Sequence, residues 1–199
     1  MSSRRRRKKL PEPTLVTIER MSHEGRGIAH INGKNVLVFG ALKDEQVRIQ
    51  ITRTNRNYDQ ATTLEVVRPS ESRIEPKCGA FHVCGGCSLQ HLDNDDQVKF
   101  KQQSVLEMMQ HAGVGVMQSI PPLRSNAWGY RRKARLGVRY VRKKGRVLVG
   151  FRERNKRFLA DLSRCEVLIP EVGERLGALA ELIEQLDARE SIPQIEVAA

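Results

Sequence analysis

Four cysteines are the residues of this chain that are best suited to chemistry. Cys78, Cys84 and Cys87 share one loop with the spacing C-x5-C-x2-C, and Cys165 lies far downstream. Four thiolates are the usual ligand set of a structural zinc ion or of an iron–sulfur cluster. Three ligands from one loop and one remote ligand favour a cubane 4Fe–4S cluster, because structural zinc sites more often use two short C-x-x-C-type knuckles. On spacing alone, zinc stays open as the alternative.

Glycines and histidines surround the cysteines. Gly85 and Gly86 fill the gap between the second and third cysteine, where the lack of a Cβ lets backbone N–H groups approach the sulfurs. The remote Cys165 would close a long loop and stabilise a chain in which only 5% of residues are aromatic. His82 and His91 are also close in sequence, but with four cysteines available we expect both to be ordinary surface or core residues.

The charge of the chain indicates a polyanionic partner. Lys and Arg number 35 against 23 Asp and Glu, for a formal charge of +12. Most of it falls in residues 124–165, which hold 15 basic and only 2 acidic side chains. Such a density of like charge favours nucleic acid, whose binding is driven by counterion release. The candidate phosphate contacts are Arg131, Arg132, Lys133, Arg135, Arg142, Lys143 and Lys144.

Aromatic residues interleave with these charges and could stack on bases of single-stranded RNA. They are Trp128, Tyr130, Tyr140 and Phe151. For Trp128 and Phe151 we favour a place in the hydrophobic core.

The elements that must position these residues predict an α+β protein. Five short strands, over 14–18, 28–31, 35–39, 46–51 and 61–67, predict a small five-stranded β-barrel of the OB type. The dipeptide Asn32-Gly33 predicts a hairpin turn between two of them.

The second half predicts helices and a further hairpin. Residues 93–113 read as a helix with an Asp N-cap, with Gly113 as its end and with Met108 and Met109 as core-filling residues. A hairpin is expected over 135–141 and 146–151, with 158–162 as a third strand. Pro170 begins a last helix, whose apolar stripe is Val172, Leu176, Leu179, Ile183 and Leu186. Residues 194–199 resemble the opening of another strand.

Several protein classes are disfavoured. No window approaches 18 consecutive apolar residues, so we expect no membrane span. The basic residues 4–9 are followed by Leu10-Pro11-Glu12-Pro13 rather than by an apolar segment, which argues against a secretory signal. We therefore expect a cytoplasmic protein, and a monomer, in which a disulfide role for the cysteines is disfavoured.

The cysteine loop resembles that of a known family. The run Cys78-x5-Cys84-Gly85-Gly86-Cys87, followed by Ser88-Leu89-Gln90-His91-Leu92, is similar to the cluster loop of bacterial RNA uracil-C5 methyltransferases. The stretch Trp128-Gly129-Tyr130-Arg131-Arg132-Lys133-Ala134-Arg135-Leu136 resembles their basic strand, and residues 14–68 look like a TRAM domain.

The resemblance implies a structural 4Fe–4S cluster on Cys78, Cys84, Cys87 and Cys165 that helps to seat the RNA. A TRAM domain together with the cluster implies a member that methylates 23S ribosomal RNA at C5 of a uridine, with S-adenosylmethionine as methyl donor. One departure is local: the turn Leu42-Lys43-Asp44-Glu45 lacks the Pro-Gly often found in TRAM domains, but Asp44 tolerates turn geometry.

A second departure concerns catalysis. In this family the nucleophilic cysteine, the base and the cofactor site lie in a C-terminal Rossmann-like domain, and this sequence has neither an Asp-Pro-Pro-Arg nucleophile loop nor a strand–glycine loop–helix unit. We therefore expect a truncated chain that is inactive alone although the intact protein is an enzyme.

The expected domains are a basic disordered tail over 1–13, a TRAM barrel over 14–68, and an iron–sulfur and RNA-binding domain over 69–92 and 124–199. An inserted helix over 93–123 is expected to pack on the missing methyltransferase domain. The alternative is a non-enzymatic RNA-binding or ribosome-assembly module with a structural Zn(Cys)4 site.

Overall fold

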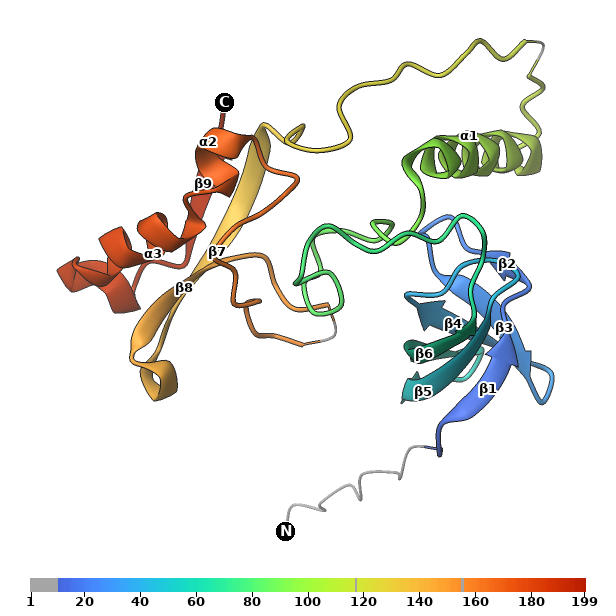
Figure 1. Ribbon diagram of the computed structural model, residues 1–199, viewed down its shortest axis with the longest axis horizontal. Coiled ribbons are helices and arrows are strands. Elements are labelled where there is room, and N and C mark those ends of the chain that lie inside the picture. Colours follow the sequence, from blue (N-terminus) through green and yellow to red (C-terminus); the bar gives the residue numbers. More distant parts are fainter. Residues whose placement is uncertain (1–10, 117, 155) are drawn as a thin grey trace. The chain divides into compact units, whose positions relative to one another are not determined.

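The computed structural model describes residues 11–116, 118–154 and 156–199 (Figure 1). The predicted basic tail lies outside the described residues over 1–10. The chain divides into two compact units. Unit 1 runs to Ile74 and includes His91–Ser104, and unit 2 comprises Glu75–Gln90 and Val105–Ala199.

The strands and helices follow one another along the chain in the order given next. They are β1 (Thr14–Thr17), β2 (Arg20–Met21), β3 (Gly27–Ile31), β4 (Lys34–Phe39), β5 (Gln46–Thr54), β6 (Tyr58–Arg68), α1 (Asn94–His111), β7 (Lys133–Val141), β8 (Arg146–Gly150), α2 (Pro170–Gly173), α3 (Leu176–Glu184) and β9 (Gln194–Ala198), with 3₁₀ turns at Arg142–Lys144 and Asp187–Glu190.

Unit 1 is built on one sheet with the strand order β1-β5-β6-β4-β3-β2 (Figure 1). Its two end strands, β1 and β2, belong to one stretch of chain, which is interrupted only at Ile18 and Glu19. The Ile18 amide donates to the Glu45 carbonyl and the Glu19 amide donates to the Ile28 carbonyl, each at 2.9 Å. The first half of this stretch pairs with β5 and the second with β3, so that the sheet curls around a core that includes Ile18. The described residues of unit 1 thus form six strands where five were predicted, because Arg20–Met21, beyond the strand predicted over 14–18, forms the additional strand β2.

The turn predictions in unit 1 are confirmed. Asn32 and Gly33 join β3 to β4 with φ angles of 50° and 77°, both positive as a type I′ hairpin turn requires. Asp44 has a φ of 66°, so it adopts the left-handed conformation that asparagine and aspartate tolerate best among non-glycine residues.

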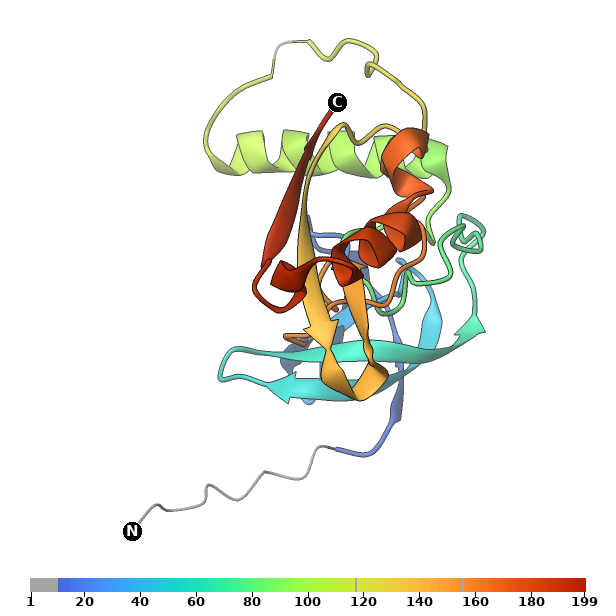
Figure 2. The same cartoon turned by 90° about the vertical axis from the view of Figure 1, so that its left-hand side faces the viewer.

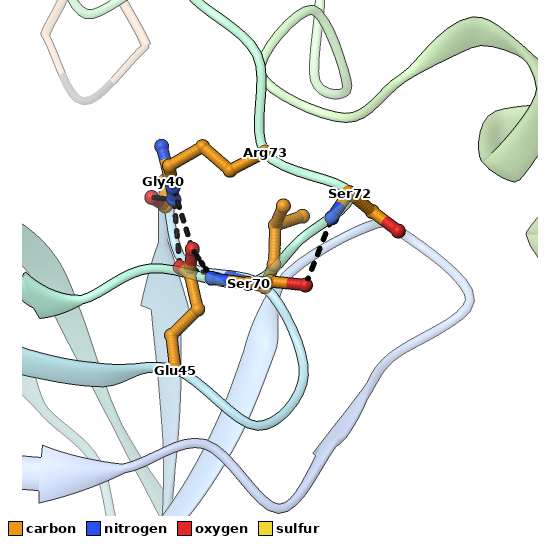
Figure 3. A network of polar contacts seen from close by, with 6 residues as sticks. Gly40, Glu45, Ser70, Ser72 and Arg73 are labelled. Carbon is orange, nitrogen blue, oxygen red and sulfur yellow. Dashed lines mark hydrogen bonds and ion pairs between the residues drawn. The ribbon is translucent and has the colours of Figure 1, made fainter.

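A buried carboxylate ties the end of this sheet to the chain that leads toward the cysteines (Figure 3). Glu45 is 0% exposed and accepts hydrogen bonds from the amides of Leu42 at 2.8 Å and Ser70 at 3.1 Å. The guanidinium of Arg73 donates to both of its oxygens, at 2.5 and 2.7 Å, and to the carbonyl of Gly40 at 2.8 Å. Arg73 also forms a bridge with Leu92, so the two stems of the segment that carries three of the cysteines pair with each other.

Helix α1 begins and ends as predicted but buries none of its side chains. Asp93 caps it, with its side chain accepting from the Asp95 amide at 2.9 Å, and Gly113 follows it with a φ of 73°. Met108 and Met109 are 49% and 38% exposed, so the prediction that they fill a core is wrong for the described residues. The pattern indicated an apolar side of the helix, but it does not by itself say what covers that side.

Unit 2 contains a three-stranded antiparallel sheet with the order β8-β7-β9, and α3 lies across one of its faces (Figures 1 and 2). The hairpin of β7 and β8 and the strand at 194–198 are confirmed, whereas residues 158–162 form no strand. Their Leu159 side chain instead lies over Gly137 of β7, where a Cβ would come within 2.6 Å of it. The core between sheet and helix is formed by Leu136, Val138, Val147, Val149, Leu168, Leu176 and Ile183.

The last predicted helix is broken into α2 and α3. In a continuous helix the Gly177 amide would donate to the Gly173 carbonyl. Here the Gly173 carbonyl accepts from the Cys165 amide at 2.8 Å, and the Gly177 amide donates to the Ser163 carbonyl at 3.2 Å. Residues 163–165 thus bind both the Gly173 carbonyl and the Gly177 amide, and the helix is interrupted between them. Leu186, the last residue of the predicted apolar stripe, is 43% exposed.

Among the helices of the described residues, none combines the length and the apolar composition that a membrane span needs.

Candidate functional site

The four cysteines line one small cavity in unit 2. Its other lining residues are Phe81, Gly86, Gln90, Phe151, Leu162, Arg164 and Glu166. None of the four thiols forms a disulfide. We call this cavity, with the eleven residues that line it, the cysteine cavity. The remote Cys165 and the loop cysteines are therefore brought together, as the sequence predicted, by folding of the chain between them.

Close packing fixes the loop of residues 78–87, the cysteine loop. Phe81, 1% exposed, anchors its middle, and the Cys84 amide donates to the Ala80 carbonyl at 2.7 Å. The Gly86 amide donates to the Cys84 Sγ at 3.4 Å, which is the kind of contact that the glycines predicted. A Cβ on Gly86 would lie 3.1 Å from the Phe151 ring, so a larger residue would crowd this contact.

The break between α2 and α3 holds Cys165 in place. The Cys165 amide donates to the Gly173 carbonyl. The Cys165 carbonyl also lies close to Gly173, so that a Cβ on Gly173 would come within 2.4 Å of the carbonyl oxygen. Only glycine fits at that distance. The remote cysteine is thus positioned by the same contacts that interrupt the helix.

The cavity opposes thiolate formation at two of the cysteines. Burial raises the pKa of the Cys84 thiol, and repulsion from Cys87, Cys165 and Cys78 adds to this, whereas the Gly86 amide acts in the opposite direction. Burial also raises the pKa of Cys87, against a hydrogen bond from Gln90 and the positive charge of Arg131. A bound metal would reverse this balance, because a coordinated thiol is deprotonated outright.

The chemistry of this donor set fits a four-thiolate centre. All four ligands that a cubane cluster or a zinc ion requires line the same cavity, and an N–H group already contacts one sulfur. As they stand, the described His, Cys, Asp and Glu side chains include no group of three or more arranged to hold a metal ion. The cysteines that would hold the group are Cys78, Cys84, Cys87 and Cys165.

The predicted phosphate contacts differ in how far acidic side chains engage them. Arg142 pairs with Glu190 at 2.7 Å, and Arg135 with Glu196 at 2.9 Å. Lys144 pairs with Asp161 at 2.6 Å. By contrast, the exposed residues Arg132, Lys133 and Lys143 form no ion pair within the described part of the chain. Two of the three acidic partners, Glu190 and Glu196, lie after residue 165, outside the basic segment.

Comparison with known proteins finds one matching domain family and several similar proteins. The TRAM domain family matches residues 12–64, so the TRAM domain that the sequence predicted is present. A 23S rRNA (uracil(1939)-C(5))-methyltransferase RlmD from Nitrosococcus oceani is 52% identical over 190 residues, and the match covers 94% of this chain. An RlmD from Alkalilimnicola ehrlichii is 50% identical, with 98% of this chain covered. By sequence, the chain is similar to these RlmD enzymes over nearly its whole length.

The chain spans less than half the length of the relatives that it matches, 42% of the first and 44% of the second. A solved structure agrees with the fold. The tRNA (uracil-54, C5)-methyltransferase of Pyrococcus abyssi, in complex with S-adenosyl-L-homocysteine, is 25% identical with a TM-score of 0.56. That match covers 86% of this chain and 37% of the archaeal one.

Two arginines at the cysteine loop have roles that sequence reasoning did not find. Arg131, proposed as a phosphate contact, is half-buried, donates to the Gly86 carbonyl at 3.3 Å and lies 5.5 Å from the centre of the Phe151 ring. Arg154 donates to the carbonyls of Cys84 and Cys87. The basic segment contained both residues, but nothing in its pattern separated arginines that face solvent from arginines that bind the loop.

The aromatic candidates are similarly divided. Phe151 packs against the core of unit 2, as favoured above, and Trp128 is half-buried with the Lys77 Nζ 5.3 Å from its ring. Tyr140 is covered by Arg189 at 5.3 Å. Tyr130 is 50% exposed. Of the four rings, Tyr130 is therefore the one most accessible to a base.

Proposed function

We propose that this chain is the RNA-recognising part of an enzyme that methylates C5 of a uridine in 23S rRNA, with S-adenosylmethionine as the methyl donor. The RlmD relatives, named for uracil 1939, support this substrate. The archaeal neighbour carries S-adenosyl-L-homocysteine, which S-adenosylmethionine becomes when it gives up its methyl group. An rRNA substrate implies a cytoplasmic site of action.

One observation carries the proposal for this part of the protein: the four cysteines line a single cavity in the same unit as the basic strand β7. We propose that Cys78, Cys84, Cys87 and Cys165 hold a 4Fe–4S cluster. When bound, the cluster would supply a structural cross-link rather than redox chemistry. The chain's own exposed cations would then bind the RNA backbone, and Tyr130 would stack on a base.

Anaerobic purification tests the cluster. We expect about four iron and four sulfide ions per chain and visible absorption at about 400 nm. Cys165→Ser should abolish both, whereas the matched control His82→Ser, an exposed residue of the same loop, should retain them. A colourless protein loaded with zinc would instead support the alternative, a non-enzymatic RNA-binding or ribosome-assembly module with a Zn(Cys)4 site.

The salt dependence of binding tests the RNA surface. Each phosphate contact to single-stranded RNA contributes about −0.7 to the log–log salt slope. Arg132, Lys133 and Lys143 alone should therefore give a slope near −2, and about five contacts would give −3.5. The probe is an RNA fragment that surrounds uracil 1939 of 23S rRNA. A slope indistinguishable from zero would contradict the proposed interface.

We also propose that the chain alone transfers no methyl group, because all four cysteines that could serve as the nucleophile are assigned to the cluster. A methyl-transfer assay with the same RNA fragment and S-adenosylmethionine should detect no product. Turnover by the 199-residue chain would refute this.

The exposed apolar side of α1 supports a further part of the same proposal. Val105, Met108 and Met109 are 50%, 49% and 38% exposed. We propose that the segment 93–123 packs on the methyltransferase domain that would complete the protein. Hydrogen exchange over 105–123 should be slower in a full-length protein than in this chain, and equal rates would contradict the packing.

A further inference from the structure

The cysteine loop is paired along one side with a second segment of unit 2. The Gly85 amide donates to the Arg152 carbonyl at 2.8 Å, and the Arg154 amide donates to the Val83 carbonyl at 2.9 Å. Between them, Cys84 forms an antiparallel bridge with Glu153. The backbone of Arg154 is therefore fixed directly beside the loop, and this fixes the position of its Cα, from which the side chain extends.

Two guanidinium groups hold the loop's carbonyls. Arg154 Nη2 donates to the carbonyl of Cys84 at 3.0 Å and also to that of Cys87. Arg131 Nη2 donates to the carbonyl of Gly86 at 3.3 Å. Of the four successive carbonyls from residue 84 to residue 87, three are thus held by arginine. We call Arg131 and Arg154 the arginine pair.

Fixing a carbonyl also fixes the peptide plane that contains it. Because a trans peptide is planar, the N–H of the next residue must point away from the arginine that holds the carbonyl. The arginine pair therefore orients the amides of Cys87 and Ser88 as well as the Cα–Cβ bonds of Cys84 and Cys87. A guanidinium suits this task because it is permanently charged and carries several donors in a rigid fork, so that one Arg154 can bind two carbonyls.

We propose that the arginine pair positions the cysteine loop for its metal group, holding the Cys84 and Cys87 side chains in place before that group binds. Both are positioning residues, because they contact the loop backbone rather than substrate. This inference rests on the proposed function, because a metal group is what the ordered loop would receive. The contacts between the arginine pair and the loop backbone do not depend on that group. The inference also implies that Arg131 acts at the loop rather than on RNA phosphate.

Hydrogen exchange of the metal-free chain tests the ordering directly. The 199-residue chain, stripped of metal by a chelator under reducing conditions, is compared with Arg154→Met, Arg154→Lys and Arg131→Met. In Arg154→Met we expect the amides of residues 83–90 to exchange about ten- to a hundredfold faster, since two hydrogen bonds from a charged donor are lost. Arg154→Lys keeps the charge but not the fork, so its exchange should be intermediate. Arg157→Met, the exposed arginine three positions along, is the matched control and should exchange as the parent does.

A second measurement follows the metal group. In anaerobically prepared protein, a chelator should remove iron about tenfold faster from Arg154→Met than from the parent chain or Arg157→Met. If Arg154→Met fails to fold, Arg131→Met and Arg154→Lys provide both measurements.

The two proposals fail in different ways. Parent-like exchange over 83–90 in Arg154→Met and Arg131→Met would overturn the arginine pair, even if the iron is present. Absence of iron from the parent chain would overturn the cluster, and the exchange experiment would still decide whether the arginine pair orders the loop.

Discussion

Arg73 binds the carboxylate of Glu45 through two nitrogens, at 2.5 and 2.7 Å, and that carboxylate has no exposed surface. The pair joins the TRAM sheet to the first stem of the cysteine segment, and Arg73 bridges to Leu92 on the second stem. The buried ionic contact therefore anchors the first stem directly, and the second stem through its backbone pairing with the first.

Removal of the guanidinium should destabilise unit 1. Arg73→Met leaves the Glu45 carboxylate buried without its partner, which should cost about 3 kcal/mol of unfolding free energy. The measurement is urea denaturation followed by circular dichroism. The matched control is Arg48→Met, because the Arg48–Glu65 pair at 3.1 Å has side chains that are 48% and 60% exposed. Such surface pairs contribute about 0–1 kcal/mol, so similar losses in the two variants would contradict a special role for Arg73.

The same carboxylate should make stability depend on pH. Burial alone would raise the pKa of Glu45, but hydrogen bonds from Arg73, Leu42 and Ser70 outweigh it and hold the pKa below its ordinary value of 4.5. A carboxyl whose pKa is lowered by folding contributes stability above its unfolded pKa, and this is lost as the pH falls through its folded pKa. The stability advantage of the parent over Glu45→Gln should thus be constant at neutral pH and shrink below about pH 4.5. A difference that persists unchanged at about pH 3 would show that the carboxylate charge is not what stabilises unit 1.

Gly173 should be essential to the position of Cys165. In Gly173→Ala the new Cβ would meet the Cys165 carbonyl at 2.4 Å, so the backbone must shift. We expect a loss of about 1–3 kcal/mol and a lower iron content after anaerobic purification. The matched control is Gly177→Ala in α3, whose Cβ would meet nothing closer than 3.9 Å and should slightly stabilise the helix. Equal iron contents in the two variants would argue against positioning of Cys165 by the helix break.

Acidic residues after residue 165 should restrain RNA binding. Glu190 and Glu196 pair with Arg142 and Arg135, so the double variant Glu190→Gln, Glu196→Gln should free two cations for phosphate. With about 0.2–1 kcal/mol per exposed pair, affinity for the rRNA fragment should rise several-fold. Glu171→Gln, Glu181→Gln makes the same change in charge at exposed sites that have no ion pair within the described chain. An equal gain in both would mean that net charge, rather than release of these two arginines, controls affinity.

Local sequence signals predicted the elements of unit 1 well. Alternating apolar residues and the Asn32-Gly33 turn are short-range signals, because each is satisfied by neighbours in the chain. The limits of α1 were predicted for the same reason, since Asp93 caps it and Gly113 ends it locally. What covers an apolar side is a long-range property, so Met108 and Met109 were predicted to be in a core and are exposed.

For the candidate site, the ligand set could be predicted but its surroundings could not. The spacing of Cys78, Cys84 and Cys87 predicted a common site because three thiols in one short loop are close in any conformation. The contacts of Arg154 with that loop cross about seventy residues, and no periodic pattern encodes them.

The sequence by itself determined the type of protein: its donor set, its positive charge and its short strands follow from residue identity and near-neighbour spacing. Only the tertiary structure decided which groups meet. It broke the last helix because residues 163–165 compete for its backbone hydrogen bonds, and it buried Glu45 against Arg73. It also divided the basic residues into those that hold the loop, those that pair with acids and those that remain exposed. These outcomes depend on competition between distant groups for the same partner, and that competition is settled only when the whole chain packs.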